Sequence, residues 1–366
     1  MRLRLRAAMV AGVAAAVAIA GSAATAQAGG GHHDELVPVV DGLNGPRGIG
    51  ITKSDRLVYA EADGTVSKTV LRGPRKGHTR VIAQVPAGFI APAVDSGRPG
   101  VVWILTAGAD PGGEGATLYR WTHRSGEARP VADIAAYQAH DIDPFDLEDL
   151  PDESNPYGVA GLKDGSALVA DAAGNDLLRV WPNGRIRTVA RLKPRVVEMP
   201  EGYPEEAGLP PAGTPIPSEA VATSVTVGRD GYYYVGELRG FPATPGTSQI
   251  WRIAPNAKKA TCNPEHPYRG KCKRFADGFT SLVDLGTDKW GGIYAVELVK
   301  ESWLKFELGL TEPIGSLYRI PRRGGEPREL AAGQVTLPGG VATDSRGRIY
   351  LTQPIFGEGT VSRVKR

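Results

Sequence analysis

The sequence predicts an all-β fold, a six-bladed β-propeller built from four-stranded antiparallel blades. Three observations support this prediction: a four-strand unit at residues 154–192, six spaced copies of part of that unit, and a lone strand before the first copy. One four-stranded sheet cannot bury both of its faces alone, so repeated units are expected to pack against one another.

The unit at residues 154–192 contains four short apolar runs, each of which fits one strand. Hairpin turn signals separate them, at Lys163-Asp164-Gly165 and at Pro182-Asn183-Gly184. Aspartate or asparagine followed by glycine favours the tight turns of antiparallel hairpins. The unit is therefore predicted to be a four-stranded meander.

Six ungapped windows of fourteen residues share the pattern of the first two strands: 48–61, 93–106, 158–171, 224–237, 284–297 and 340–353. The eighth position is glycine in five windows and Asp55 in the first, as a turn with positive φ requires. The eleventh and twelfth positions are apolar or aromatic in every window, which predicts a buried second strand.

A third strand follows each window and carries a basic residue at a fixed place. These residues are Lys68, Arg120, Arg179, Arg252, Arg319 and Arg363. One charge per blade, spread around a ring, cannot converge on one ligand. We therefore expect these side chains to serve packing and solubility.

The lone strand Leu36–Val40 precedes the first window, and the sixth unit ends at Arg366 without a fourth strand. If the early strand completes the last blade, no sheet edge stays open. We predict this closure, and a single propeller domain over residues 29–366.

Residues 1–28 have the pattern of a secretory signal peptide. Arg2, Arg4 and Arg6 precede an uncharged run over residues 7–20, and Ala26-Gln27-Ala28 fits a cleavage site. Removal of this segment lowers the formal net charge from +3 to zero, which argues against nucleic acid as a partner. We expect a secreted, extracellular monomer with no membrane span in the mature chain. Cys262 and Cys272 are then expected to form a disulfide.

Three long irregular segments are expected on one face of the ring, because they follow second or fourth strands. They are residues 135–154, 193–221 and 298–315. The first is acidic and either binds calcium or is simply solvated. The second is proline-rich and should be extended. The third contains a short amphipathic helix over residues 301–306, either a lid on the channel or a packing element. Long ordered loops commonly carry function, so this face is the expected binding face.

Carboxylates end the second strands on that face, at Glu61, Asp171, Glu237 and Glu297. Asp171, Glu237 and Glu297 are candidate ligands for calcium, which prefers oxygen donors, and such an ion could polarise an ester carbonyl. The alternative is that each acid caps a turn or pairs with an arginine. Four further residues approach the same mouth and complete the candidate binding site: Asn155, Tyr157, Asn175 and Asp284.

Four segments resemble the ScyD/ScyE family, which is named for genes clustered with synthesis of the pigment scytonemin. They are Ser154-Asn155-Pro156-Tyr157-Gly158 and residues 170–180, 235–242 and 278–285. The resemblance implies an exported, propeller-like protein and supplies no reaction. The Ala-Asp-x-x-x-Asn pattern at residues 170–175 is also similar, more remotely, to NHL repeats and to calcium-dependent lactonase propellers.

Two hypotheses for function follow. The first is a binding protein that holds a small molecule, glycan or protein segment at the loop-bearing mouth of the channel. The second is a calcium-assisted hydrolase or lactonase at the same mouth. No catalytic triad, phosphate loop or histidine-rich metal spacing identifies catalytic residues.

Overall fold

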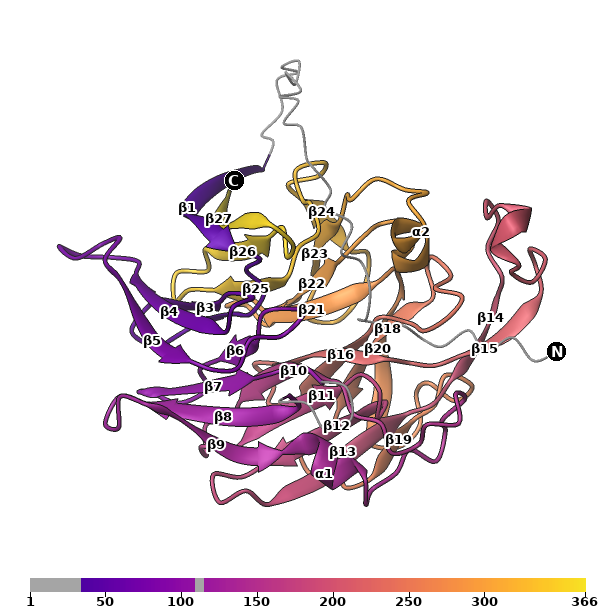
Figure 1. Cartoon of the computed structure of the whole chain (residues 1–366), viewed down its shortest axis with the longest axis horizontal. Helices are drawn as coiled ribbons and strands as arrows, with labels where there is room; N and C mark the ends of the chain where they lie inside the picture. The colour runs from indigo at the N-terminus through magenta and orange to yellow at the C-terminus, as the bar shows by residue number, and fades with distance from the viewer. Residues whose placement is uncertain (1–33, 109–114) are drawn as a thin grey trace, which may run out of the picture.

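The computed structural model describes residues 34–108 and 115–366, and the signal peptide expected over residues 1–28 lies outside them. Within them, six four-stranded antiparallel sheets form the blades of a propeller (Figure 1), as predicted. In each blade the first strand lies at the central channel. No helix of the described part is long and apolar enough to cross a membrane.

The strands of the first three blades follow one another along the chain. Blade 1 contains β2 (Ile49–Ile51), β3 (Arg56–Ala60), β4 (Thr65–Val70) and β5 (Thr79–Gln84). Blade 2 contains β6 (Ala93–Asp95), β7 (Val101–Leu105), β8 (Thr117–Thr122) and β9 (Ala128–Asp133). Blade 3 contains β10 (Pro156–Gly161), β11 (Ala167–Asp171), β12 (Asp176–Val180) and β13 (Ile186–Leu192).

The remaining blades complete the ring. Blade 4 contains β16 (Ala222–Val227), β17 (Tyr233–Glu237), β18 (Ser248–Ile253) and β20 (Cys272–Phe279). Blade 5 contains β21 (Leu282–Thr287), β22 (Ile293–Glu297), β23 (Ser316–Ile320) and β24 (Arg328–Leu330). Blade 6 contains β25 (Gly340–Thr343), β26 (Ile349–Gln353), β27 (Glu358–Lys365) and β1 (Glu35–Asn44).

The ring closes in blade 6 as predicted, because a strand from the start of the propeller completes the last blade. The early strand β1 pairs antiparallel with β27, with Leu36 opposite Val364 and Asn44 opposite Glu358. The strand is longer than the sequence pattern indicated, because its pairing continues past Val40 to Asn44 across an irregularity between Val40 and Leu43. This pairing covers the outer edge of β27, which would otherwise be open.

The core is divided into clusters, most of which join two neighbouring blades. Between blades 1 and 2, for example, Val58 and Ile82 pack with Val94 and Trp121. Between blades 4 and 5, Ile250 packs with Leu285. The two faces of each sheet are thereby buried by its neighbours, which is why one blade alone would not be stable.

The turns between first and second strands have the predicted backbone. All six residues at the eighth position of the windows have positive φ: Asp55, Gly100, Gly165, Gly231, Gly291 and Gly347. Three of the recurring basic residues form ion pairs with an aspartate of these turns, in the pairs Arg179–Asp164, Arg252–Asp230 and Arg319–Asp288. These contacts agree with the packing role that we expected for the recurring charge.

The three long insertions follow second or fourth strands, and we call the face on which they emerge the decorated face (Figure 1). The first insertion holds α1 (Ile134–Gln138). The second holds the hairpin of β14 (Arg195–Glu198) and β15 (Pro215–Ser218), with a 3₁₀ turn, η1 (Glu205–Ala207), between its strands. The third holds α2 (Trp303–Glu307), the short helix predicted for this segment.

The disulfide between Cys262 and Cys272 is present as predicted. It joins β19 (Ala260–Cys262) to the first residue of β20. β19 pairs in parallel with β13, so the disulfide loop also adds a fifth strand to blade 3. The loop therefore connects blades 3 and 4 in addition to closing a local segment.

Candidate functional site

The central channel is narrow because small residues line its first strands. It encloses a cavity of about 150 Å³ bordered by residues of all six blades. A Cβ atom added to Gly48 would lie 2.2 Å from the carbonyl oxygen of Pro92, and one added to Gly158 would lie 2.7 Å from that of Thr223. Glycine at these positions lets neighbouring first strands approach closely.

Two carboxylates, Asp95 and Asp284, interrupt this small lining. Asp95 Oδ2 accepts a hydrogen bond of 2.7 Å from the backbone N–H of Gly161, and Asp284 Oδ2 accepts one of 2.7 Å from Val341. Each bond crosses to the next blade. Burial raises the pKa of both carboxyl groups, and that of Asp284 to about 7.

Arg47 and Tyr157 lie at the decorated end of the channel, where β2 and β10 begin. The Arg47 side chain is only 3% exposed. Its Nη1 donates to the carbonyl of Ala91 at 2.9 Å, and its Nη2 donates to the carbonyl of Tyr157. The positive charge of Arg47 opposes the rise in the pKa of Asp284. Arg47 thus supplies a fixed cation inside the channel.

Asp171 and Asn155 belong to a buried polar network at the decorated end of blade 3. Asp171 accepts hydrogen bonds from Ser154 Oγ at 2.7 Å and from the Asn155 backbone N–H at 2.8 Å. Gln138 of the first insertion donates to it at 3.2 Å. Burial raises the pKa of Asp171 despite these donors. The carboxylate therefore holds the first insertion against blade 3.

Asn175 makes a second connection in the same region. Its Nδ2 donates to Asp143 of the first insertion at 3.0 Å. Its Oδ1 accepts from the backbone N–H of Val221, at the end of the second insertion, at 2.7 Å. Asn175 has positive φ (47°), which asparagine tolerates better than most residues. This side chain joins two insertions to one blade.

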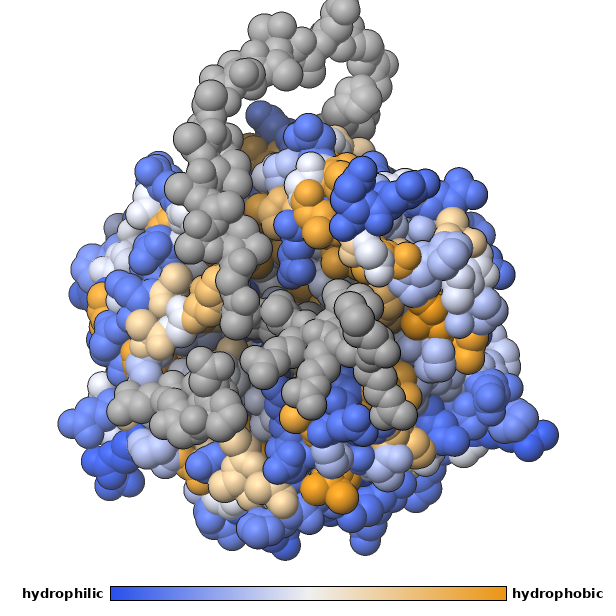
Figure 2. Space-filling model, turned by 45° about the vertical axis from the view of Figure 1, so that its right-hand side comes forward, coloured by the Kyte–Doolittle hydropathy of each residue, from blue (hydrophilic) through white to orange (hydrophobic). Residues whose placement is uncertain are grey.

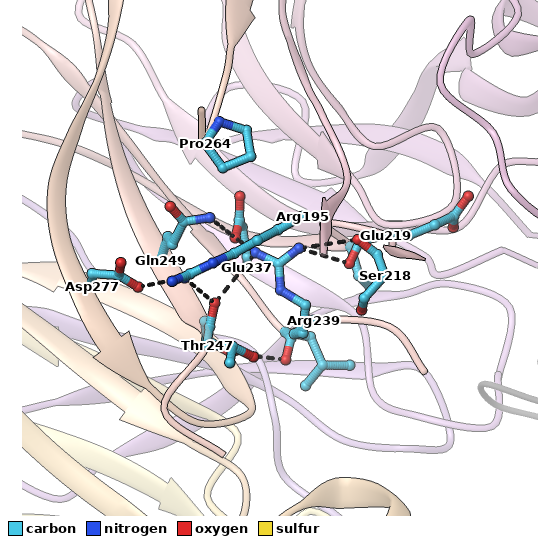
Figure 3. Close-up of polar contacts among 12 residues, drawn as sticks. Arg195, Ser218, Glu219, Glu237, Arg239, Thr247, Gln249, Pro264 and Asp277 are labelled. Carbon is cyan, nitrogen blue, oxygen red and sulfur yellow. Dashed lines mark hydrogen bonds and ion pairs between the residues drawn. The ribbon is translucent and has the colours of Figure 1, made fainter. Parts of the chain in front are cut away.

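Glu237 lies at the centre of a buried network in blade 4 (Figure 3). It accepts hydrogen bonds from Arg239, from Trp251 Nε1 and, at 3.0 Å, from Gln249. Arg239 also donates to the carbonyl of Ser218 at the end of the hairpin β14–β15. The guanidinium group neutralises the carboxylate. Glu237 therefore pairs with an arginine, which was the alternative to a calcium ligand.

Glu297 and Glu61 lie in separate surroundings. Glu297 accepts a hydrogen bond of 2.6 Å from the backbone N–H of Thr280 and one from Ser316 Oγ, and burial raises its pKa to about 7. Glu61 is half-buried and accepts one bond of 2.9 Å from the backbone N–H of Asn44. Both acids cap backbone near the end of a second strand.

The structure therefore brings together only some of the candidate residues. Tyr157 and Asp284 line the channel, Asn155, Asp171 and Asn175 share the blade 3 region, and the glutamates stand apart. Across residues 34–108 and 115–366, no three His, Cys, Asp or Glu side chains are placed to hold a metal ion. The three proposed calcium ligands instead accept bonds from protein donors in separate networks.

Asp95 was not among the site residues predicted from the sequence. A usable signal existed, because the first and third window positions face the channel and are otherwise mostly glycine or alanine. Asp95 occupies a third position and Asp284 a first position, so both stand out as carboxylates in columns of small residues. Two aspartates there indicate a polar channel even without any knowledge of their partners.

Comparison with known proteins supports the fold. No family model matches the chain, and no curated protein matches its sequence. A solved glucose dehydrogenase has a TM-score of 0.56 at 12% identity, covering 91% of this chain and 99% of that chain. A gluconolactonase from Xanthomonas campestris has a TM-score of 0.54 at 11% identity, covering 91% and 90%. A streptogramin B lyase has a TM-score of 0.50 at 12% identity, covering 91% and 98%.

At these identities the likeness shows the architecture alone. The chain is a six-bladed β-propeller whose solved structural neighbours include lactonase, lyase and sugar dehydrogenase propellers. Their different reactions are performed on one scaffold, so function has to be argued from the surface and the site of this chain.

Proposed function

We propose that the protein is a secreted binding protein whose decorated face holds a ligand with apolar and positively charged groups. Among the small molecules, glycans and protein segments that the sequence left open, a basic, apolar protein segment fits this face best. The observation that carries the proposal is the distribution of exposed hydrophobic side chains over the two faces of the propeller.

Most of the large exposed hydrophobic side chains of the described chain are in the loops and insertions of the decorated face. They are Phe89, Ile142, Leu147, Leu150, Val196, Leu308, Leu310 and Phe356. Hydrophobic residues are visible as separate patches in an otherwise mostly hydrophilic surface on the side that carries α2 and the hairpin (Figure 2). Exposed apolar groups concentrated on one face are typical of interaction surfaces.

Acidic side chains accompany these apolar groups in the first insertion. Asp146, Asp149 and Asp152 are exposed or half-buried there. Burial and the nearby acids Glu219 and Glu153 raise the pKa of Glu148 to about 7. Carboxylates that crowd one another are stabilised by a positively charged partner, so this loop favours basic ligands.

The insertions are also held in place before any ligand arrives. Glu219 accepts a hydrogen bond from the backbone N–H of Leu147 at 2.8 Å, which joins the first and second insertions. Trp303 of α2 is buried, and its Nε1 donates to the carbonyl of Arg239 at 2.9 Å. A surface that is ordered in advance loses less conformational entropy on binding. Trp303 also supports a packing role for α2.

Export is part of the proposal. The disulfide suits an oxidising compartment, and the signal sequence supplies the route. We also infer membership of the ScyD/ScyE family from the four sequence segments named above. That inference concerns the family and compartment, and it adds no substrate.

Binding of a fluorescent peptide of alternating leucine and lysine residues tests the proposal. Fluorescence anisotropy with the mature protein should show saturable binding. The variant I142S/L150S should bind at least about tenfold more weakly, because it removes apolar area from the decorated face. The matched control V39S/V81S changes two exposed side chains on outer strands and should bind like wild type. Absence of binding, or equal weakening in both variants, would overturn the proposal.

A hydrolase or lactonase that acts in the channel is the second candidate. Asp284 favours it, because a carboxyl group with a pKa of about 7 is suited to general acid–base chemistry. If the hydrolase used calcium, Asp171 and Glu237 would have to give up the hydrogen bonds that they accept from protein groups in order to bind the ion. We therefore assign no step of the reaction to calcium. Thermal melting with and without calcium, repeated with D171A and E237A, tests the metal. A panel of lactones and esters with D284N tests the chemistry.

A further inference from the structure

The turns between first and second strands surround the channel on the face opposite the insertions, and every one of them carries a cation. Apart from Arg348, which pairs with Asp344 of its own turn, they are Lys53, Arg98, Lys163, Arg229, Lys289 and Arg346. Five are exposed, and Lys289 is half-buried. These cations lie in turns, whereas the recurring basic residues lie in third strands. The packing role of the recurring residues therefore does not explain the cations of the turns.

Four of these cations border one hollow. A cavity of about 710 Å³ lies on this face and is lined by Lys53, Lys163, Arg229 and Lys289. Ile51, Thr287 and Thr343 line both this cavity and the central channel. The hollow is thus the wide end of the channel, and we call it the basic funnel.

The acids of the basic funnel do not neutralise these cations. Its lining contains Asp55, Asp164, Asp288 and Asp344, and each is paired with an arginine other than the six cations named above. Asp164 pairs with Arg179, for example, and Asp288 pairs with Arg319 at 2.6 Å.

The turn cations therefore remain as unbalanced positive charge. Among the described residues, Lys53, Lys163 and Arg229 have no salt-bridge partner, and Lys289 donates to the backbone carbonyl of Arg346 at 2.8 Å. Like charges in a hollow with protein walls produce a stronger potential than the same charges on a flat surface.

This charge is separated from the acids of the decorated face. The chain from residue 29 onward has a formal net charge of zero, so the excess of cations at the basic funnel is balanced elsewhere. Solubility alone would be served by mixed charges on both faces. An exposed aromatic ring also stands beside the funnel: Trp290 is 55% exposed, and Lys289 Nζ lies 4.3 Å from its ring centroid. Such a ring offers an apolar contact next to the charges.

We propose that the basic funnel is a second binding site, which takes a compact multivalent anion carrying several carboxylate, sulfate or phosphate groups. Lys53, Lys163 and Arg229 would contact the anionic groups from three different blades. This site lies on the other face of the propeller from the proposed peptide site, so the two proposals can fail independently.

Isothermal titration calorimetry at low ionic strength tests the second site, with two probes: inorganic tripolyphosphate and trigalacturonate. The first probe presents phosphates and the second presents carboxylates on a sugar chain, so the two arms separate the possible sources of the anion. Wild-type protein should bind at least one probe, with an affinity that falls as salt is added. The variant K53Q/K163Q/R229Q should bind the probe about tenfold more weakly, because three exposed ion pairs with the anion are lost.

The matched control is R75Q/K76Q/R124Q, which removes three exposed cations from turns between third and fourth strands, outside the funnel lining. It should bind like wild type. Equal weakening of both triple variants would show general surface attraction and overturn the proposal, as would the absence of binding to both probes. Melting temperatures of both variants should match wild type, since the substituted side chains are exposed.

Discussion

The guanidinium group of Arg47 lies 3.7 Å from the centre of the Tyr157 ring, and the same side chain donates a hydrogen bond to the Tyr157 carbonyl. Arg47 belongs to blade 1 and Tyr157 to blade 3, while the second bond of Arg47 reaches Ala91 before blade 2. One buried cation therefore connects three blades at the decorated end of the channel.

Replacement of Arg47 by methionine should destabilise the propeller by about 2 kcal/mol, because two hydrogen bonds and a cation–π contact are lost. Chemical denaturation measures the change. R47K should recover only part of the loss, since lysine keeps the charge but not the planar fork of donors. An R47M protein as stable as wild type would mean that this contact does not hold the blades together.

The free energy of unfolding should depend on the protonation of Asp284. Its pKa is about 7 in the folded state and 3.8 in the reference state, so the folded protein holds the proton more tightly. The stability from this proton is complete below pH 3.8 and is lost as the pH rises through about 7.

D284N keeps an oxygen for the Val341 N–H and carries no charge. It should therefore gain stability relative to wild type above pH 7 and show little difference at acidic pH, in denaturation curves recorded across this range. E358Q changes an exposed acid and serves as the control. A constant difference between D284N and wild type at every pH would contradict the assignment.

Glu237 should matter for stability more than Glu61, although both end a second strand. E237Q leaves the buried guanidinium of Arg239 without its counter-charge, which should cost about 3 kcal/mol. E61Q changes a half-buried acid that accepts a hydrogen bond from the backbone N–H of Asn44 and should cost less than about 1 kcal/mol. Equal melting temperatures for the two variants would show that the ion pair contributes nothing.

Much of the fold was predictable because it repeats. Glycine or Asp55 in each first turn, the basic residue in each third strand and the unmatched early strand all have local sequence signals. The candidate site was less predictable. Asp171 and Glu237 were identified at strand ends, but the bond from Gln138 to Asp171 follows from packing of the first insertion against blade 3. Arg239 is only two residues from Glu237, but its bond to Ser218 follows from packing of the second insertion against blade 4.

The basic funnel on the face opposite the insertions could also be predicted only in part from the sequence. Each turn cation is visible in the sequence, but the hollow that gathers Lys53, Lys163 and Arg229 appears only when the blades close into a ring. The ion pairs that bind the neighbouring aspartates to third-strand arginines also depend on strand register. Periodicity therefore indicates which residues recur, and the structure determines which of them have no partner.

The most direct test of the proposed function is hydrogen–deuterium exchange of the mature protein with and without the leucine–lysine peptide. Binding at the decorated face should slow exchange in the first insertion around Ile142 and Leu150, in β14 and in the segment after α2. The turns at Lys53 and Lys163 on the opposite face should be unchanged. Slowed exchange confined to those turns, or no change in the insertions under saturating peptide, would contradict the assignment of the decorated face as the binding face.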